Sequence, residues 1–125
     1  MAARLLLVED DFMLRISLAE LLASQGYDVT CAADGAEGLA RLLHEPPPAL
    51  IVLDICMPRI DGFSFRTVQL QTSLVRDIPT IALTSLVEPK VNSFGFDAVV
   101  PKRATFDGLI EAITALCPPA PRAAT

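Results

Sequence analysis

The chain alternates short apolar runs with longer segments in which apolar residues recur every three or four positions. Continuous apolar or β-branched runs predict strands at residues 5–8, 27–32, 49–53 and 78–83, with a shorter strand at 98–100. Helical spacing predicts helices at residues 12–25, 36–43 and 63–72. A closing helix is indicated by the periodic apolar positions Phe106, Leu109, Ile110, Ile113 and Leu116.

Residues with special backbone preferences mark where these elements end. Gly26 is a suitable stop for the first helix, and the prolines at 46–48 end the second. Thr105 or Asp107 is suited to cap the closing helix, because such side chains accept hydrogen bonds from free amides at a helix start. The resulting order contains five βα units and predicts an α/β fold, a parallel sheet with helices on both faces and right-handed connections.

Polar side chains gather at the predicted ends of the strands. In open parallel sheets, ligands bind beyond the carboxyl ends of the strands, where the strand order reverses. The candidate functional residues are therefore those that follow the strands: Glu9, Asp10, Asp11, Asp54, Thr84, Ser85 and Lys102.

The composition fits one domain with a substantial core. The chain has 125 residues, of which 52% are hydrophobic and 20% charged, and this balance argues against disorder. We interpret residues 1–117 as the domain and residues 118–125 as a Pro/Ala-rich C-terminal tail.

The charge and the apolar pattern narrow the class of protein. A net charge of −5 argues against a nucleic-acid-binding module and against a polybasic membrane-surface protein. The apolar runs are too short to span a membrane, and the start of the chain shows no secretory signal segment. Three widely spaced cysteines, Cys31, Cys56 and Cys117, fit reduced, mostly buried thiols. We therefore expect a cytoplasmic protein.

Three carboxylates converge at one edge of the predicted sheet. Glu9, Asp10 and Asp54 should repel one another unless a cation lies between them. A hard divalent ion resolves this conflict, and magnesium characteristically uses few carboxylates together with a phosphate. Lys102 adds a positive charge and Thr84 a hydroxyl donor, so the set matches what phosphoryl transfer onto an aspartate requires.

Each of these residues also has an ordinary interpretation. Acidic residues after a strand are common, and a single aspartate such as Asp54 often caps a helix. Thr84 is a good strand former, and a single lysine such as Lys102 is usually a solvated charge. Their joint occurrence at the strand ends of one topology favours a functional site over separate ordinary roles.

The chain resembles the receiver domain of the two-component response regulator family over residues 4–116. The resemblance is carried by residues 7–11 (LVEDD), 51–62 (IVLDICMPRIDG) and 82–85 (ALTS), and by Lys102. The second stretch is the most specific. The resemblance implies a doubly wound, five-stranded parallel sheet in the flavodoxin-like order 2-1-3-4-5.

The resemblance also implies a metal site around an acceptor aspartate. Asp54 matches the phosphate-accepting residue, while Glu9 and Asp10 match the acidic pair that binds Mg²⁺ together with it. Cys56 matches the position whose backbone carbonyl completes the magnesium site, so no ligating thiol is implied.

Two further residues match the switch of the family. Thr84 matches the hydroxyl that moves toward the phosphoryl group, and Lys102 matches the lysine that pairs with that group. Pro58 and Gly62 match the loop that follows the acceptor. A phosphoryl group adds charge and acceptor oxygens, and the switch consists of recruiting Thr84 and Lys102 to them.

The resemblance implies a stand-alone phosphoacceptor and not an enzyme that turns over an external substrate. The donor is a phosphohistidine on a sensor histidine kinase or on a histidine phosphotransfer protein. The start of the first helix, with Phe12, Met13, Arg15 and Ile16, matches the docking region for that donor. Core packing of Phe12 and Met13 is the alternative. No output domain follows in the sequence, so we expect protein–protein contact or phosphorelay as the output.

The chain departs from the family pattern near its fifth strand. The order Pro101-Lys102-Arg103 replaces the usual Lys-Pro with its cis peptide, so we expect a rebuilt loop. Val99 occupies the position of the aromatic switch residue, and valine cannot swing as an aromatic ring does. Only eighteen positions separate Thr84 from Lys102, about one helical turn fewer than is typical. With Pro89 in this interval, the fourth helix should be short, skewed or irregular.

Three other functions remain as alternatives. The altered output side is compatible with a phosphorylation-independent adaptor that keeps the receiver fold. An aspartate-based phosphohydrolase shares the carboxylate and magnesium but requires a second aspartate where Cys56 stands. In a flavodoxin-like flavin protein, the acidic run at 9–11 would repel the phosphate that such proteins bind after the first strand.

Overall fold

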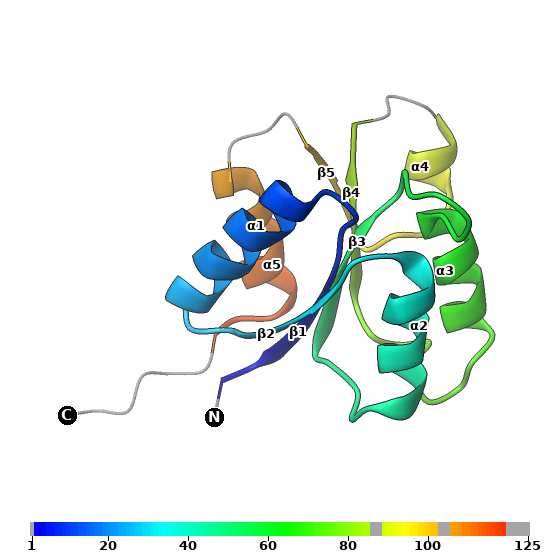
Figure 1. Cartoon of the computed structure of the whole chain (residues 1–125), viewed down its shortest axis with the longest axis horizontal. Helices are drawn as coiled ribbons and strands as arrows, with labels where there is room; N and C mark the ends of the chain where they lie inside the picture. Colours follow the sequence, from blue (N-terminus) through cyan, green and yellow to red (C-terminus); the bar gives the residue numbers. More distant parts are fainter. Residues whose placement is uncertain (1, 86–88, 103–105, 120–125) are drawn as a thin grey trace.

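The computed structural model describes residues 2–85, 89–102 and 106–119, in which strands and helices alternate along the chain (Figure 1). The strands are β1 (Arg4–Val8), β2 (Asp28–Ala32), β3 (Leu50–Asp54), β4 (Thr80–Thr84) and β5 (Ala98–Pro101). The helices are α1 (Phe12–Ser24), α2 (Gly35–His44), α3 (Gly62–Leu70), α4 (Pro89–Ser93) and α5 (Phe106–Leu116). Each strand and helix predicted by range is present, with bounds shifted by at most two residues.

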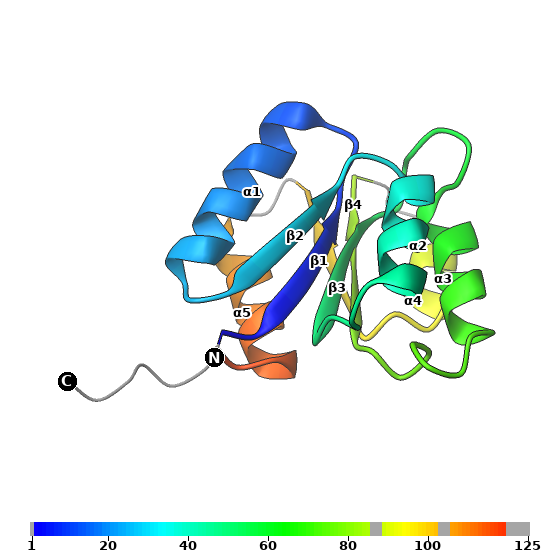
Figure 2. The same cartoon turned by 60° about the horizontal axis from the view of Figure 1, so that its bottom comes forward.

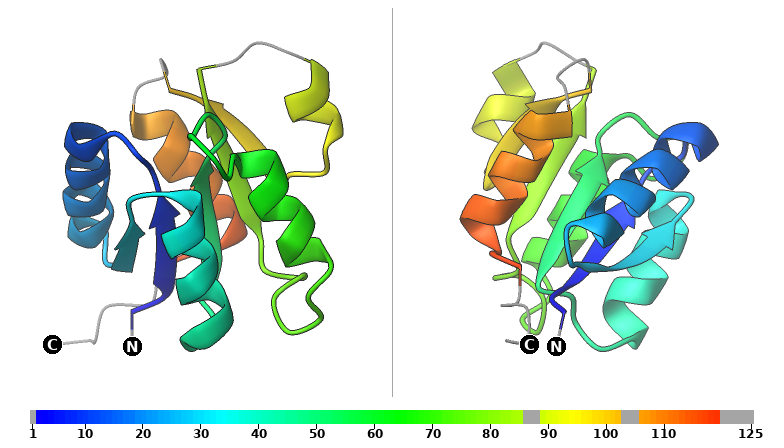
Figure 3. Two further views of the ribbon diagram at one scale, coloured as in Figure 1. Left: turned by 45° about the vertical axis from the view of Figure 1, so that its right-hand side comes forward. Right: turned by 90° about the vertical axis from the view of Figure 1, so that its left-hand side faces the viewer.

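The strands form one parallel sheet in the order β2-β1-β3-β4-β5, which confirms the fold class. Helices α1 and α5 lie on one face of the sheet, and α2, α3 and α4 lie on the other (Figures 1 and 3). The strand order reverses between β1 and β3, which lie side by side (Figure 2). In folds of this kind, ligands bind in the crevice beyond the carboxyl ends of the strands at such a reversal.

The strands are apolar on both faces because both faces are covered. Along β1, Leu5 and Leu7 pack in the cluster beneath α1 and α5, while Leu6 and Val8 pack in the cluster beneath α2 and α3. This alternation follows from the two-residue period of a strand. It explains why the buried strands read as continuous apolar runs in the sequence.

Three helices begin at aspartates that act as N-caps. The side chains of Asp11, Asp34 and Asp61 accept hydrogen bonds from backbone amides three residues later, at 3.1, 2.8 and 2.8 Å. Gly26 follows the end of α1 with a φ of +96°, as its predicted stopping role requires. For the closing helix, Asp107 lies within the first turn and is not the cap, and Thr105 lies outside the described residues.

Helix α4 is short, as predicted, and packs on a group of aromatic rings. It has five residues, and Val91 is its buried side chain. The rings of Phe63, Phe94 and Phe96 lie 5.0 to 6.3 Å apart, and half-buried Val99 packs in the same cluster. Within the described ranges, no helix is long and apolar enough to cross a membrane.

The end of β5 explains how the sequence accommodates Pro101 before Lys102. Asp97 donates its amide to the carbonyl of Thr80, and donors in a parallel ladder alternate along the strand. The donor expected opposite Thr84 is therefore Pro101, which has no N–H. The amide of Lys102 makes this bond instead, at 2.8 Å from the Thr84 carbonyl oxygen. The rest of the predicted loop, from residue 103, lies outside the described residues.

Candidate functional site

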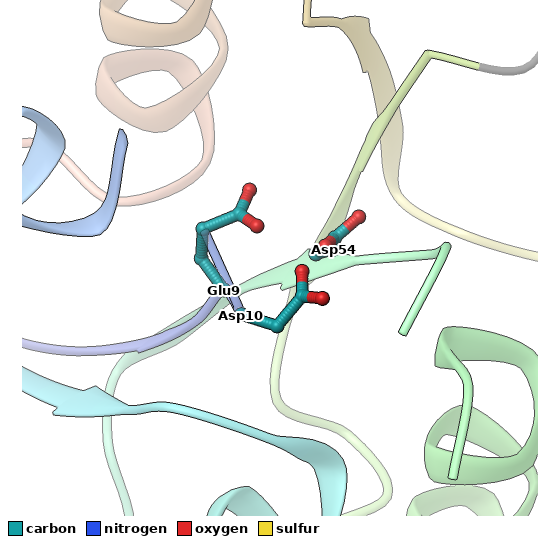
Figure 4. A group of neighbouring side chains, drawn as sticks. All are labelled: Glu9, Asp10 and Asp54. Carbon is teal, nitrogen blue, oxygen red and sulfur yellow. The ribbon is translucent and has the colours of Figure 1, made fainter. Parts of the chain in front are cut away.

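Three carboxylates gather at the crevice between the ends of β1 and β3. Glu9 and Asp10 follow β1, and Asp54 is the last residue of β3, the neighbouring strand. Ligand oxygens of the three side chains lie within 4.8 Å of one another (Figure 4). Glu9 and Asp54 are fully buried, and Asp10 is exposed at the mouth of the group.

Lys102, directly after β5, supplies positive charge to this group. Its Nζ lies 2.9 Å from Glu9 Oε1 and 3.1 Å from Asp54 Oδ1. These contacts outweigh the effect of burial and raise the pKa of Lys102 above its usual value, so the ammonium stays charged at neutral pH. Lys102 thus contacts both buried carboxylates, Glu9 after β1 and Asp54 at the end of β3.

One positive charge does not neutralise three carboxylates. Burial, followed by the neighbouring Glu9 and Asp10, raises the pKa of Asp54 to about 8 despite Lys102. Asp54 therefore holds a proton near neutral pH when no cation is bound, and the interaction with Asp54 lowers the pKa of Asp10. A proton therefore takes the place that a further cation would fill.

The donor set fits a hard divalent cation such as Mg²⁺. Asp54 Oδ2 is buried and has no hydrogen-bond partner among the described residues, although buried carboxylate oxygens normally have one. Asp54 Oδ1 accepts a bond from the Cys56 amide at 3.1 Å, which holds the carboxylate in place. Three carboxylates with one uncommitted oxygen are the oxygen ligands that magnesium prefers.

The structure excludes the ordinary roles of Asp54 as a helix cap and of Lys102 as a solvated charge. Asp54 does not cap α3, because Asp61 does, and Lys102 is ion-paired rather than freely solvated. Asp11, also a candidate functional residue, is the cap of α1 and stands outside the carboxylate group. Thr84 is the buried last residue of β4, next to β3 in the sheet. The switch role of Thr84 and the ligand role of the Cys56 carbonyl stay predictions.

The loop after Asp54 depends on a close approach at Gly62. The amide of Gly62 donates to the carbonyl of Ile55 at 2.9 Å. A Cβ atom at this position would lie 2.6 Å from the Ile55 side chain and 2.9 Å from the Asp54 carbonyl oxygen. Only glycine fits, so Gly62 is required for the path of the loop after Asp54.

The exposure of the start of α1 rules out one of its two interpretations, and donor docking stays a prediction. Phe12 and Met13 are 60% and 70% exposed, so the core-packing alternative is wrong. Arg15, on the same turn of α1, makes a contact that was not predicted from the sequence. Its Nη1 donates to the backbone carbonyl of Glu9 at 2.9 Å. In the sequence, the one indication of this contact is that Arg15 lies about one helical turn after the acidic residues 9–11. Cys56 is exposed, which corrects the expectation of mostly buried thiols.

The comparisons with known protein families and curated proteins agree. The model of the response regulator receiver domain matches residues 5–114. The response regulator MprA of Mycobacterium bovis is 37% identical over 120 residues, which cover 93% of this chain and 51% of that protein. The transcriptional regulatory protein AfsQ1 of Streptomyces coelicolor is 52% identical over 59 residues, which cover 47% of this chain and 26% of that protein.

Solved structures show the same fold. Chemotaxis protein CheY4 of Vibrio cholerae superposes with a TM-score of 0.85 at 26% identity, covering 93% of this chain and 99% of that chain. Response regulator TrrA of Thermotoga maritima, solved in complex with Mg²⁺-BeF, gives 0.81 at 29% identity, covering 91% and 98%. The chain spans about half the length of the curated MprA relatives it matches, so its stand-alone status stays a prediction.

Proposed function

The chain belongs to the response regulator receiver family of two-component signalling, and we propose that it accepts a phosphoryl group on Asp54 from a phosphohistidine. The observation that carries this proposal is the buried Asp54 carboxylate, which has one uncommitted oxygen and lies between an acidic pair and Lys102. We propose Mg²⁺ as the cofactor, as in the Mg²⁺-BeF complex of the Thermotoga maritima relative.

The site residues have separate roles in the proposed phosphoryl transfer. Glu9, Asp10 and Asp54, with the carbonyl of Cys56, would hold Mg²⁺, which supplies charge neutralisation for phosphoryl transfer when it is bound. Asp54 forms the new O–P bond, and the P–N bond of the donor breaks with its electron pair left on the imidazole nitrogen. Lys102 and Thr84 then bind the oxygens of the transferred group, and this is the switch.

The proposed partner is a sensor histidine kinase or a histidine phosphotransfer protein. Exposed Phe12, Met13 and Ile16 on α1 lie next to the carboxylates, since α1 begins directly after them. A small apolar pocket between α1 and α5 is lined by Leu14, Leu18, Phe106 and Leu109, among others. An apolar surface beside a phosphoacceptor fits docking of a helical donor.

The remaining features of the proposed role follow from the same site. The chain accepts and loses phosphate on its own Asp54, so no turnover of an external substrate is proposed. Its output is a protein–protein contact or onward transfer of the phosphoryl group, in the cytoplasm where sensor kinases present phosphohistidine. Neither nucleic acid nor the membrane is a proposed direct partner.

The test is phosphorylation by acetyl phosphate and by purified sensor kinases. Intact-mass measurement should show a gain of one phosphoryl group that requires Mg²⁺ and is absent in Asp54→Asn. A phosphotransfer profile across the host's kinases should identify one fast donor. Absence of labelling under conditions that label another receiver would overturn the proposal.

A second candidate function rests on the output side of the sheet. Val99 stands at the position of the aromatic switch residue and packs in the same apolar cluster as Phe63, Phe94 and Phe96, beside a five-residue α4. This surface suits an adaptor that binds its target without phosphorylation. Unchanged target binding and phenotype in Asp54→Asn, together with loss of both on deletion of the gene, would favour the adaptor.

A further inference from the structure

The backbone of the acidic turn needs an anchor, because Glu9 and Asp10 carry like charges side by side. The Glu9 amide donates to the carbonyl of Ala32 at 3.1 Å, which fixes one side of this residue to β2. On its other side, the Glu9 carbonyl accepts the bond from Arg15 Nη1 at 2.9 Å. The bond to a guanidinium is charge-assisted and stronger than a bond between neutral groups.

The Glu9 carbonyl is an effective point at which to hold the turn. Its oxygen lies in the same rigid plane as the amide nitrogen and Cα of Asp10. A bond that holds this oxygen therefore helps to hold the Cα atom of Asp10, from which the side chain leaves the backbone. Asp10 is exposed, so packing alone does not set the position of its carboxylate.

Arg15 is itself held in place and directed at the turn. Its guanidinium lies 5.5 Å from the ring centroid of Phe12, one turn earlier on α1. In the part of the chain that the structure describes, no carboxylate pairs with it within 4.0 Å. Lys102 binds the carboxylates of the site, whereas Arg15 binds its main chain.

We propose that Arg15 is a positioning residue that holds Glu9 and Asp10 in the arrangement that binds the metal ion. Arg15 acts through the Glu9 carbonyl and does not touch the ion or the phosphoryl group. The inference rests on the proposed magnesium site and extends it to a residue outside the ligand set. Partners that orient metal ligands affect affinity strongly, so loss of Arg15 should weaken Mg²⁺ binding about tenfold.

The test is the dissociation constant of Mg²⁺, measured by titration calorimetry on the unphosphorylated chain. Arg15→Ala should weaken binding about tenfold, and Arg15→Lys, which keeps a charged donor, should recover part of the affinity. Arg41→Ala is the matched control, because it removes an equal charge from α2, where Arg41 pairs with Glu37 and Glu45. Its affinity should equal that of the wild type. If Arg15→Ala does not fold, Arg15→Gln replaces it.

Phosphorylation gives a second, separable measurement. In Arg15→Ala, the Mg²⁺ concentration for half-maximal labelling by acetyl phosphate should rise by the same factor as the dissociation constant. Labelling at saturating Mg²⁺ should be retained. An unchanged Mg²⁺ affinity in Arg15→Ala, with or without a lower melting temperature, would overturn this inference alone. A wild type that binds Mg²⁺ but takes up no phosphoryl group would instead overturn the proposed function.

Discussion

Arg59 adopts a left-handed backbone conformation in the loop that follows Asp54. Its φ is +66°, and among the described residues it is the one non-glycine with a positive φ. Its side chain is largely exposed and lies 3.6 Å from Asp34, so this ion pair contributes little to stability. The free energy of this ion pair is therefore smaller than the cost of the left-handed conformation at Arg59.

Arg59→Gly should stabilise the protein. Glycine removes the left-handed penalty of roughly 1–2 kcal/mol but adds chain entropy to the unfolded state, so we expect a net gain of about 0.5–1 kcal/mol. Urea unfolding measures this change. Arg59→Ala is the control, because it removes the ion pair but keeps the Cβ atom. Equal stabilities of the two variants would show that the backbone conformation is not the cause.

The raised pKa of Asp54 has a consequence for stability in the absence of metal. Asp54 titrates at about 8 in the folded chain and near 3.9 when unfolded, so between these values the folded state binds the proton more tightly. The free energy of unfolding should therefore fall as pH rises from about 4 to about 8. Below this window the carboxyl is protonated in both states, and above it the loss is complete.

Asp54→Asn should remove this pH dependence, because the amide stays neutral. We expect the wild type to lose on the order of 2 kcal/mol more than Asp54→Asn between pH 5 and pH 8.5 in EDTA. Denaturant unfolding at the two pH values measures the difference. Saturating Mg²⁺ should restore the wild type at pH 8.5 and leave the variant nearly unchanged. Parallel profiles for both proteins in EDTA would contradict the prediction.

At the scale of the elements, a buried arginine joins α3 to β4 and to the segment after α4. Nη1 of Arg66 donates to Gln69 Oε1 and Thr80 Oγ1, both at 2.9 Å. Its Nη2 donates to the Gly95 carbonyl at 2.8 Å and lies 3.6 Å from Asp97. These contacts and the aromatic rings hold α4 in place, although α4 itself contributes few buried side chains.

Arg66→Ala should lower the free energy of unfolding by about 3–5 kcal/mol, because it removes a buried guanidinium with its three donated hydrogen bonds and leaves the Gly95 carbonyl without that donor. Arg66→Lys should recover part of the loss, since a lysine cannot form the forked contacts. Urea unfolding gives the magnitude, and faster amide exchange of residues 89–97 in Arg66→Lys would locate the effect. Exposed Arg76→Ala is the control and should change stability by less than about 0.5 kcal/mol. A loss of similar size in both alanine variants would contradict this account.

Sequence patterns predicted the elements better than the contacts between them. The buried strands were visible because helices cover both faces of the sheet, and the shortened α4 followed from Pro89 and the close spacing of Thr84 and Lys102. The three carboxylates could be placed together because the ends of neighbouring parallel strands meet. The partners of Arg15 and Arg66 could not be predicted. Their bonds depend on side-chain direction in the folded chain, and an arginine inside a helix has no periodic signal.

At the scale of the whole molecule, the proposed phosphorylation site and the proposed donor-docking surface consist of different side chains. Met13 is 70% exposed on α1 and lies outside the carboxylate group. Met13→Ser should slow phosphotransfer from the protein donor by about tenfold, as expected for an apolar contact worth roughly 1.4 kcal/mol. Labelling by acetyl phosphate should not change, because that small donor needs no docking surface.

Leu74→Ser is the matched control for this prediction. Leu74 is 87% exposed in the segment between α3 and β4, at the opposite end of α3 from the acceptor loop. Its replacement should affect neither donor. Equal slowing of protein-mediated transfer in both variants would show that surface hydrophobicity in general, and not the start of α1, determines the rate.

The amide proton of Lys102, which takes the place of the missing N–H of Pro101, can serve as an NMR probe of the site. This proton is bonded to the carbonyl of Thr84 at 2.8 Å, and the side chain of the same residue binds Glu9 and Asp54. Any shift of the end of β4 lengthens or shortens this one bond and so changes a single backbone resonance and its exchange rate with solvent. Isotope labelling alone therefore makes the conformational state of the site readable, with no fluorophore or engineered cysteine.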